Sequence, residues 1–114
     1  MQHIDNAKSR FAATKLRIAD LSQTQINRLV EITNQKMRDK EVMKNNLFCC
    51  LKYGSNGDLK ITCDSHYFEN REAYTFYPNG ELSIAYWADG LISKYFAEAF
   101  EAWLDEITPI PQAV

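Results

Sequence analysis

Two stretches of the chain alternate hydrophobic and polar residues around an Asn-Gly pair. Residues 56–61 read Asn-Gly-Asp-Leu-Lys-Ile, and residues 79–84 read Asn-Gly-Glu-Leu-Ser-Ile. A period of two is the pattern of a β-strand, and Asn-Gly between two such segments is the strongest local signal for a β-hairpin. The pattern therefore predicts two consecutive hairpins within residues 47–88.

The apolar residues of the first hairpin select its register. A two-residue loop would bring a lysine to the core side, because a shift by one residue exchanges the faces of a strand. A three-residue loop at 55–57, with its glycine in the left-handed conformation, sets Leu51 opposite Ile61 and Cys49 opposite Cys63. We therefore predict the three-residue loop.

The second hairpin follows the same rule. A loop at 78–80 has proline at the first corner of a type I turn and glycine at the bulge position. This register sets Phe76 opposite Leu82 on the apolar face and Arg71 opposite Trp87 on the other face. We expect the guanidinium of Arg71 to stack on the indole as a cation–π contact.

Three other segments carry hydrophobic residues at helical spacing. The first covers residues 4–20. The second begins at a capping box of Ser22 and Gln25 and is expected to end within 40–46. The third, residues 90–107, has the widest apolar stripe.

The elements follow one another as α-α-β-β-β-β-α within one domain, residues 1–114. The helical part is 1–46, the antiparallel sheet is 47–88 and the C-terminal helix is 89–108. The predicted class is α+β: two N-terminal helices, a four-stranded antiparallel meander of two hairpins, and a C-terminal helix packed on the sheet. This prediction allows the two N-terminal helices to pack on either face of the sheet.

The charges are divided unevenly along the chain. The net charge is −2, yet residues 1–60 hold eleven Lys or Arg against six Asp or Glu, and residues 61–114 hold two against nine. One explanation is a protein with two faces for two partners. The other is that complementary elements lie side by side within the fold.

Composition narrows the class of protein. Hydrophobic residues make up 46% and charged residues 25%, the usual mixture of a globular domain. No apolar run approaches the roughly 18 residues of a membrane helix, and the first twenty residues are too charged for a signal peptide. The three cysteines do not all pair within one chain. We therefore expect a cytoplasmic protein.

The first functional hypothesis is a non-enzymatic module that binds another, larger protein. Aromatic and arginine residues dominate the energetics of interfaces, and acidic surfaces steer basic partners. A small protein with segregated charge suits a stoichiometric inhibitor, an immunity protein or a phage anti-defence protein of the anti-CRISPR type, acting on a nucleic-acid-processing partner. A homodimer would use the same surfaces. The candidate binding residues are Arg71, Tyr77, Trp87, Glu98, Glu101 and Asp105.

A second hypothesis assigns the basic half of the chain to nucleic acid. Basic side chains on the two N-terminal helices would neutralise phosphates, and aromatic side chains on the sheet would stack on bases. The acidic third helix counts against it, because it would repel the phosphate backbone. The basic residues concerned are Lys8, Arg10, Lys15, Arg17, Arg28, Lys36, Arg38 and Lys40.

A third hypothesis is a thiol or zinc site at Cys49, Cys63 and His66. Thiolate and imidazole are the ligands that zinc prefers. Neighbouring residues of a strand point to opposite faces, however, so the ligands would converge only with a bulge. Cysteines that pack as small hydrophobic residues are the simpler expectation. We therefore predict no catalytic residue, no metal and no cofactor.

Overall fold

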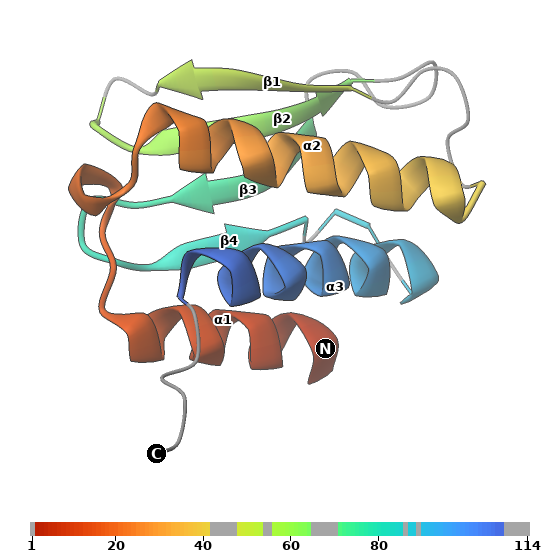
Figure 1. The fold of residues 1–114 in the computed structure, drawn as a ribbon, viewed down its shortest axis with the longest axis horizontal. Coiled ribbons are helices and arrows are strands. Elements are labelled where there is room, and N and C mark those ends of the chain that lie inside the picture. Colours follow the sequence, from red (N-terminus) through yellow and green to blue (C-terminus); the bar gives the residue numbers. More distant parts are fainter. Residues whose placement is uncertain are drawn as a thin grey trace.

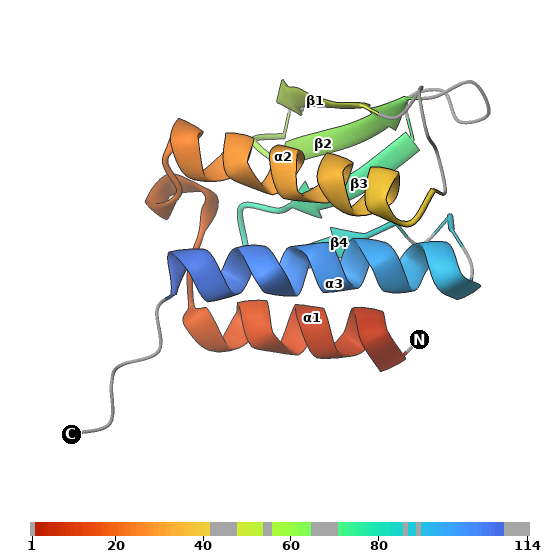
Figure 2. The same cartoon turned by 45° about the vertical axis from the view of Figure 1, so that its right-hand side comes forward.

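The computed structural model describes residues 2–41, 48–53, 56–64, 71–85, 87–88 and 90–108 (Figure 1). Within these residues, three α-helices form a layer on one face of an antiparallel sheet with strand order β1-β2-β3-β4 (Figures 1 and 2). The elements are α1 (Gln2–Thr14), a 3₁₀ helix (Ile18–Asp20), α2 (Gln23–Asp39), β1 (Phe48–Tyr53), β2 (Leu59–Asp64), β3 (Arg71–Phe76), β4 (Leu82–Ile84) and α3 (Gly90–Ile107).

The α+β class is confirmed, but the N-terminal helices differ from the prediction in detail. The first helix ends at Thr14 rather than at residue 20, because Lys15 adopts a φ of 58° that stops the helix. The 3₁₀ helix occupies part of the remaining segment. The predicted capping box is present: the Ser22 hydroxyl accepts from the Gln25 N–H at 3.1 Å, and Gln25 Oε1 accepts from the Ser22 N–H at 2.8 Å.

The predicted register of the first hairpin is confirmed. Leu51 pairs with Ile61 and Cys49 pairs with Cys63, and Gly57 has a φ of 84°. An L-amino acid with a side chain is strained in this left-handed region, whereas glycine enters it freely. The apolar pattern and the turn glycine thus sufficed to determine this register.

The second hairpin is confirmed as far as β4 extends. Phe76 pairs with Leu82, and Gly80 has a φ of 93°. At the loop, the Tyr77 N–H donates to the Glu81 carbonyl at 3.0 Å and the Gly80 N–H donates to the Tyr77 carbonyl at 2.9 Å. These two bonds close the three-residue loop that the sequence predicts.

The predicted pairing of Arg71 with Trp87 is wrong, because the paired residues of β3 and β4 end at Tyr74 and Ile84. The register between β2 and β3 shifts by one residue, which leaves Ala73 as the additional residue of a β-bulge. Ala85 has a φ of 30° and follows the last residue of β4. Trp87 therefore lies beyond the strand, with its ring 5.9 Å from the ring of Phe96 on α3 and its indole N–H donating to the Glu72 carbonyl at 2.6 Å.

A cluster of buried aromatic rings joins the two layers. Phe100 of α3 lies at its centre, with ring centroids 5.8 Å from Phe11, 5.4 Å from Tyr74, 6.0 Å from Phe76 and 5.2 Å from Trp103. All five side chains are at most 2% exposed. Since α3 lies between α1 and α2 in the helix layer (Figure 2), the N-terminal helices cover the same face of the sheet as the C-terminal helix.

None of the helices in the described part of the chain has the length and hydrophobicity that a membrane crossing requires.

Candidate binding groove between two helices

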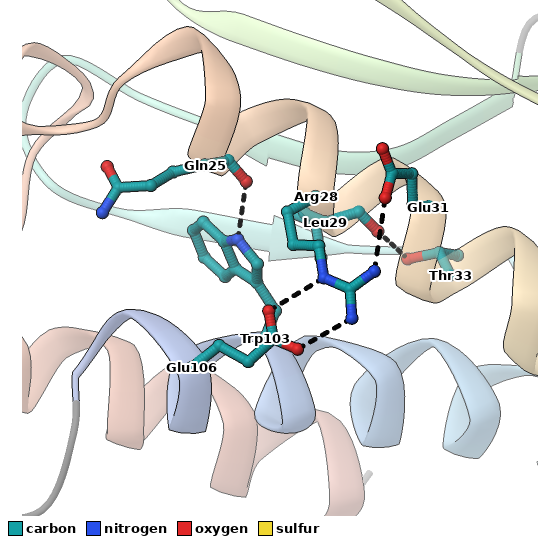
Figure 3. A network of polar contacts seen from close by, with 7 residues as sticks. All are labelled: Gln25, Arg28, Leu29, Glu31, Thr33, Trp103 and Glu106. Carbon is teal, nitrogen blue, oxygen red and sulfur yellow. Dashed lines mark hydrogen bonds and ion pairs between the residues drawn. The ribbon is translucent and has the colours of Figure 1, made fainter.

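Helices α2 and α3 lie side by side and run in opposite directions (Figures 1 and 2). Near one end of this seam, Arg28 donates two hydrogen bonds of 2.9 Å to the Glu106 carboxylate and one of 3.2 Å to Glu31 (Figure 3). Two turns further along, the Nζ atom of Lys36 lies 3.4 Å from an oxygen of Glu98. The two helices are thus tied by ion pairs at two points eight residues apart.

The other side of α3 is paired with α1. Arg10 donates to Asp105 at 2.5 Å and lies 3.5 Å from a carboxylate oxygen of Glu101. Bases from both N-terminal helices therefore neutralise acids on both flanks of α3. For these residues, the uneven distribution of charge along the sequence corresponds to complementary elements that lie side by side.

Hydrogen bonding across the seams shifts the titration of these groups. The hydrogen bonds from Arg28 lower the pKa of Glu106 below its ordinary value of 4.5, and the same bonds raise the pKa of Arg28. On the other flank, the hydrogen bond to Asp105 raises the pKa of Arg10. All of these pairs are solvent-exposed, so their effect on stability is weakened by solvent and salt.

Stability is expected to depend on pH through Glu106. Because its pKa is lowered on folding, the folded state binds fewer protons, and the stabilising contribution is present above pH 4.5 and lost as the pH falls through the lowered pKa. The variant Glu106→Gln should therefore lose stability relative to wild type at neutral pH, and the difference should shrink on acidification. Urea unfolding at low ionic strength between neutral and acidic pH measures this.

A background without the partner base provides the control for this experiment. In Arg28→Gln, the substitution Glu106→Gln should have little effect at any pH, because the hydrogen bonds that shift the pKa are absent. A difference between wild type and Glu106→Gln that stayed constant down to strongly acidic pH would contradict the assignment.

A groove of about 630 Å³ runs between α2 and α3. Its apolar lining residues are Ile32 of α2 and two short side chains of α3, Ala99 and Ala102. The charged pairs Arg28–Glu106 and Lys36–Glu98 also line it. The groove therefore combines apolar residues with charged groups that form ion pairs across the two helices.

The predicted protein-binding residues do not come together in one surface. Glu98 lines the groove, whereas Glu101 and Asp105 face α1. Arg71, which is exposed, begins β3, and Tyr77, which is 36% exposed, follows the last residue of this strand. The sixth residue, Trp87, is half-buried against the core. We therefore conclude that the acids of α3 do not form the free acidic surface that the sequence suggested.

The predicted nucleic-acid-binding residues are also divided. Those of α1 (Lys8, Arg10) and those of α2 (Arg28, Lys36, Arg38) are separated by the acidic α3. The remaining three lie between or just beyond the helices: Lys15 follows α1, Arg17 donates to the Pro78 carbonyl at 3.2 Å, and Lys40 lies 5.6 Å from the centre of the Tyr95 ring. Across the described helices, these cations do not form one continuous stripe.

Only part of the predicted thiol or zinc site is described. Cys49 and Cys63 are direct partners across β1 and β2, whereas His66 lies outside the described residues. No group of three or more His, Cys, Asp or Glu that could hold a metal ion is found in the portion of the chain that the structure places.

The groove was missed at the level of sequence, although its signal is present there. Arg28, Ile32 and Lys36 are spaced by four residues, and so are Glu98, Ala102 and Glu106. Two antiparallel helices with these spacings bring base against acid at both ends and the small residue against the apolar one in the middle. Comparisons with family models, curated proteins and solved structures give no match to the chain.

Proposed function

We propose that this chain is a non-enzymatic module that binds a larger protein, with the α2–α3 groove as its contact surface. The observation that carries the proposal is the groove itself, with Ile32, Ala99 and Ala102 between two ion pairs. Protein interfaces commonly have an apolar centre and a polar rim. The groove offers both, on two helices that hold each other in place.

The form of the groove favours a polypeptide as the occupant. It follows two antiparallel helices, and its volume of about 630 Å³ is shared between apolar and charged lining residues. An amphipathic segment of a partner would place apolar side chains over Ala102 and polar ones against the charged ends. The partner would thereby meet groups that are already oriented, which reduces the entropy lost on binding.

Rigid attachment of α3 supports this assignment. The indole N–H of Trp103 donates to the Gln25 carbonyl in the first turn of α2 at 2.7 Å (Figure 3). About two turns earlier on the same helix, the Phe96 carbonyl accepts from the hydroxyl of Tyr74 on β3 at 2.9 Å. A surface whose two walls are joined to each other and to the sheet is preorganised for a partner.

Within this proposal, the partner is a nucleic-acid-processing protein and the chain acts as its stoichiometric inhibitor, as an immunity or anti-defence protein would. The separated bases and acids of the helix layer present alternating charge to such a partner, and alternating charge gives specificity more than affinity. Purified chain added to the partner should then abolish its activity at a ratio of one to one, with no turnover by the chain itself.

Filling the groove tests the proposal directly. The variant Ala102→Arg places a long charged side chain at an exposed lining residue of the groove. It should reduce capture of the partner by at least about tenfold, the effect expected for a clash at an interface centre. The measurement is affinity capture from the native host with the full chain as bait, followed by quantification of each captured protein. The control is Ala13→Arg, which alters an exposed alanine of α1 outside the groove.

The comparison of the two variants decides the result. A protein captured by wild type and by Ala13→Arg but lost with Ala102→Arg supports the groove. Equal capture by both variants would show that the contact surface lies elsewhere. Recovery of nucleic acid alone, released by moderate salt, would contradict the proposal and favour the basic residues of α1 and α2.

A further inference from the structure

Three residues form a row across neighbouring strands. Cys49 of β1 is the direct partner of Cys63 of β2, and Cys63 is the direct partner of Arg71 of β3. The third cysteine, Cys50, is paired with Thr62. Residues that are directly opposite in an antiparallel sheet share a face and have Cβ atoms within about 5.5 Å. The register thus places two cysteines directly opposite each other, with an arginine at the next register position along the row.

Directly opposite residues of an antiparallel ladder form either hydrogen-bonded or non-hydrogen-bonded pairs. Comparison with the second hairpin shows to which of the two types Cys49–Cys63 belongs. There, Tyr77 and Glu81 form a hydrogen-bonded pair, and pair types alternate along an antiparallel ladder. The next pair, Phe76–Leu82, is therefore a non-hydrogen-bonded pair. Its leucine follows the left-handed turn glycine by two residues.

The first hairpin repeats this geometry. Leu59 follows the left-handed Gly57 by two residues and pairs with Tyr53, so Tyr53–Leu59 is also a non-hydrogen-bonded pair. Cys49–Cys63 lies four residues further along both strands, and because the two types alternate, it is a non-hydrogen-bonded pair as well. The Cα atoms of such pairs lie about 4.5 Å apart, which falls in the range of about 4.4–6.8 Å that a disulfide requires.

We propose that Cys49 and Cys63 form a reversible cross-strand disulfide when the protein meets a low-molecular-weight disulfide such as glutathione disulfide. The Cys63 thiolate attacks one sulfur of glutathione disulfide, and the bond between the two glutathione sulfurs breaks. This step releases one glutathione, which takes up a proton. The Cys49 thiolate then attacks the Cys63 sulfur and releases the second glutathione. Two protein thiols are oxidised, and one glutathione disulfide is reduced to two glutathione molecules.

Arg71 favours Cys63 as the first nucleophile. The thiolate is the reactive form of cysteine, and a neighbouring cation stabilises it. In the described sheet, Cys63 is the one cysteine of the three that is directly opposite a basic residue. Cys50 is paired with Thr62 rather than with a cysteine, so it serves as an internal reference in the same chain.

The experiment treats the full-length protein with glutathione disulfide, blocks free thiols with an alkylating reagent and measures the intact mass and the peptide map. Before alkylation, the expected product is lighter than the reduced protein by two hydrogen atoms. After alkylation, it carries one alkyl group, at Cys50, and its peptide map contains the Cys49–Cys63 cross-link. The variant Cys50→Ser should form the same cross-link. Cys49→Ser should stop at a stable glutathione adduct of Cys63.

Thermal unfolding gives a second readout, because the cross-link joins the edge strand β1 to β2 and restricts the unfolded chain. The oxidised protein should unfold at a higher temperature than the reduced protein, and a dithiol reductant should reverse the shift. Stable glutathione adducts on both cysteines, or a cross-link that includes Cys50, would overturn the proposal. An unchanged rate in Arg71→Gln, for which we expect a slowing of about threefold, would overturn the role of Arg71.

Discussion

Replacing Trp103 with alanine is expected to lower the free energy of unfolding by about 3–5 kcal/mol, the usual cost of truncating a fully buried Trp. The side chain is 0% exposed, and its ring lies 6.1 Å from that of Phe76 and 5.2 Å from that of Phe100. Alanine would leave a cavity at the point where α3 meets both α2 and the sheet. The loss should be measured by urea unfolding followed by circular dichroism.

The indole N–H contributes separately from the ring. It donates to the Gln25 carbonyl at 2.7 Å, within the first turn of α2 (Figure 3). Trp103→Phe keeps an aromatic ring but removes this donor and some volume, so a smaller loss of about 1–3 kcal/mol is expected. The comparison separates the packing of the ring from the bond that joins the two walls of the groove.

An exposed residue of the same helix provides the control. Leu91 is 57% exposed, and Leu91→Ala should change the free energy of unfolding by no more than about 0.5 kcal/mol. If Trp103→Ala cost as little as Leu91→Ala, the side chain would not hold α3 in place. The rigid groove on which the proposed function depends would then lose its main support.

Local patterns predicted the parts of the fold that local chemistry determines. Gly57 and Gly80 occupy the left-handed positions that only glycine enters freely, and the alternation around them specified both hairpin registers. The capping box at Ser22 likewise involves groups only three residues apart. In each of these cases, the residues that decide the structure are neighbours in the sequence.

The error in the pairing of Arg71 with Trp87 arose where two alanine residues take unusual backbone positions. Ala73 is the additional residue of the bulge in β3, and Ala85 has a left-handed φ of 30°. The two are joined by a hydrogen bond of 2.7 Å from the Ala85 N–H to the Ala73 carbonyl. Alanine carries no side-chain signal for a bulge or a turn, so the sequence predicted an unbroken ladder and placed Trp87 opposite Arg71.

The candidate site depends on contacts between α2 and α3, and the sequence alone does not show which helices lie side by side. The acids of α3 and the bases of α2 were both recognised, and their pairing within the fold was one of the two explanations that the sequence left open. Their pairing within the fold depends on which helix lies beside which, and that is decided by the aromatic core around Phe100. Once the antiparallel packing is known, the spacing of Arg28 and Lys36 against Glu98 and Glu106 explains the ion pairs.

The second large effect is expected at Tyr74, the one side chain of β3 that bridges α2 and α3 by hydrogen bonds in the described core. Its hydroxyl lies 3.0 Å from the Thr33 hydroxyl and 2.9 Å from the Phe96 carbonyl, and the side chain is 0% exposed. Thr33 also lies 2.8 Å from the Leu29 carbonyl. Tyr74→Ala should cost about 3–5 kcal/mol, because both the ring and these bonds are lost.

Tyr74→Phe isolates the hydroxyl and should cost about 0.5–1.5 kcal/mol. Thr33 and Tyr74 have one hydroxyl proton each, but their hydroxyls make three contacts: Thr33 with the Leu29 carbonyl, Thr33 with Tyr74, and Tyr74 with the Phe96 carbonyl. A hydrogen-bonded bridge between the helices therefore requires Thr33 to donate to Tyr74 and Tyr74 to donate to the Phe96 carbonyl. Thr33→Val keeps the branched shape of the side chain and removes the donor. A double-mutant cycle with Tyr74→Phe should therefore give a coupling energy of at least about 0.5 kcal/mol, whereas additive effects would mean that Thr33 bonds only to its own helix. Coupling would show that one buried chain of hydrogen bonds spans α2, β3 and α3 and fixes the spacing of the two helices that form the groove.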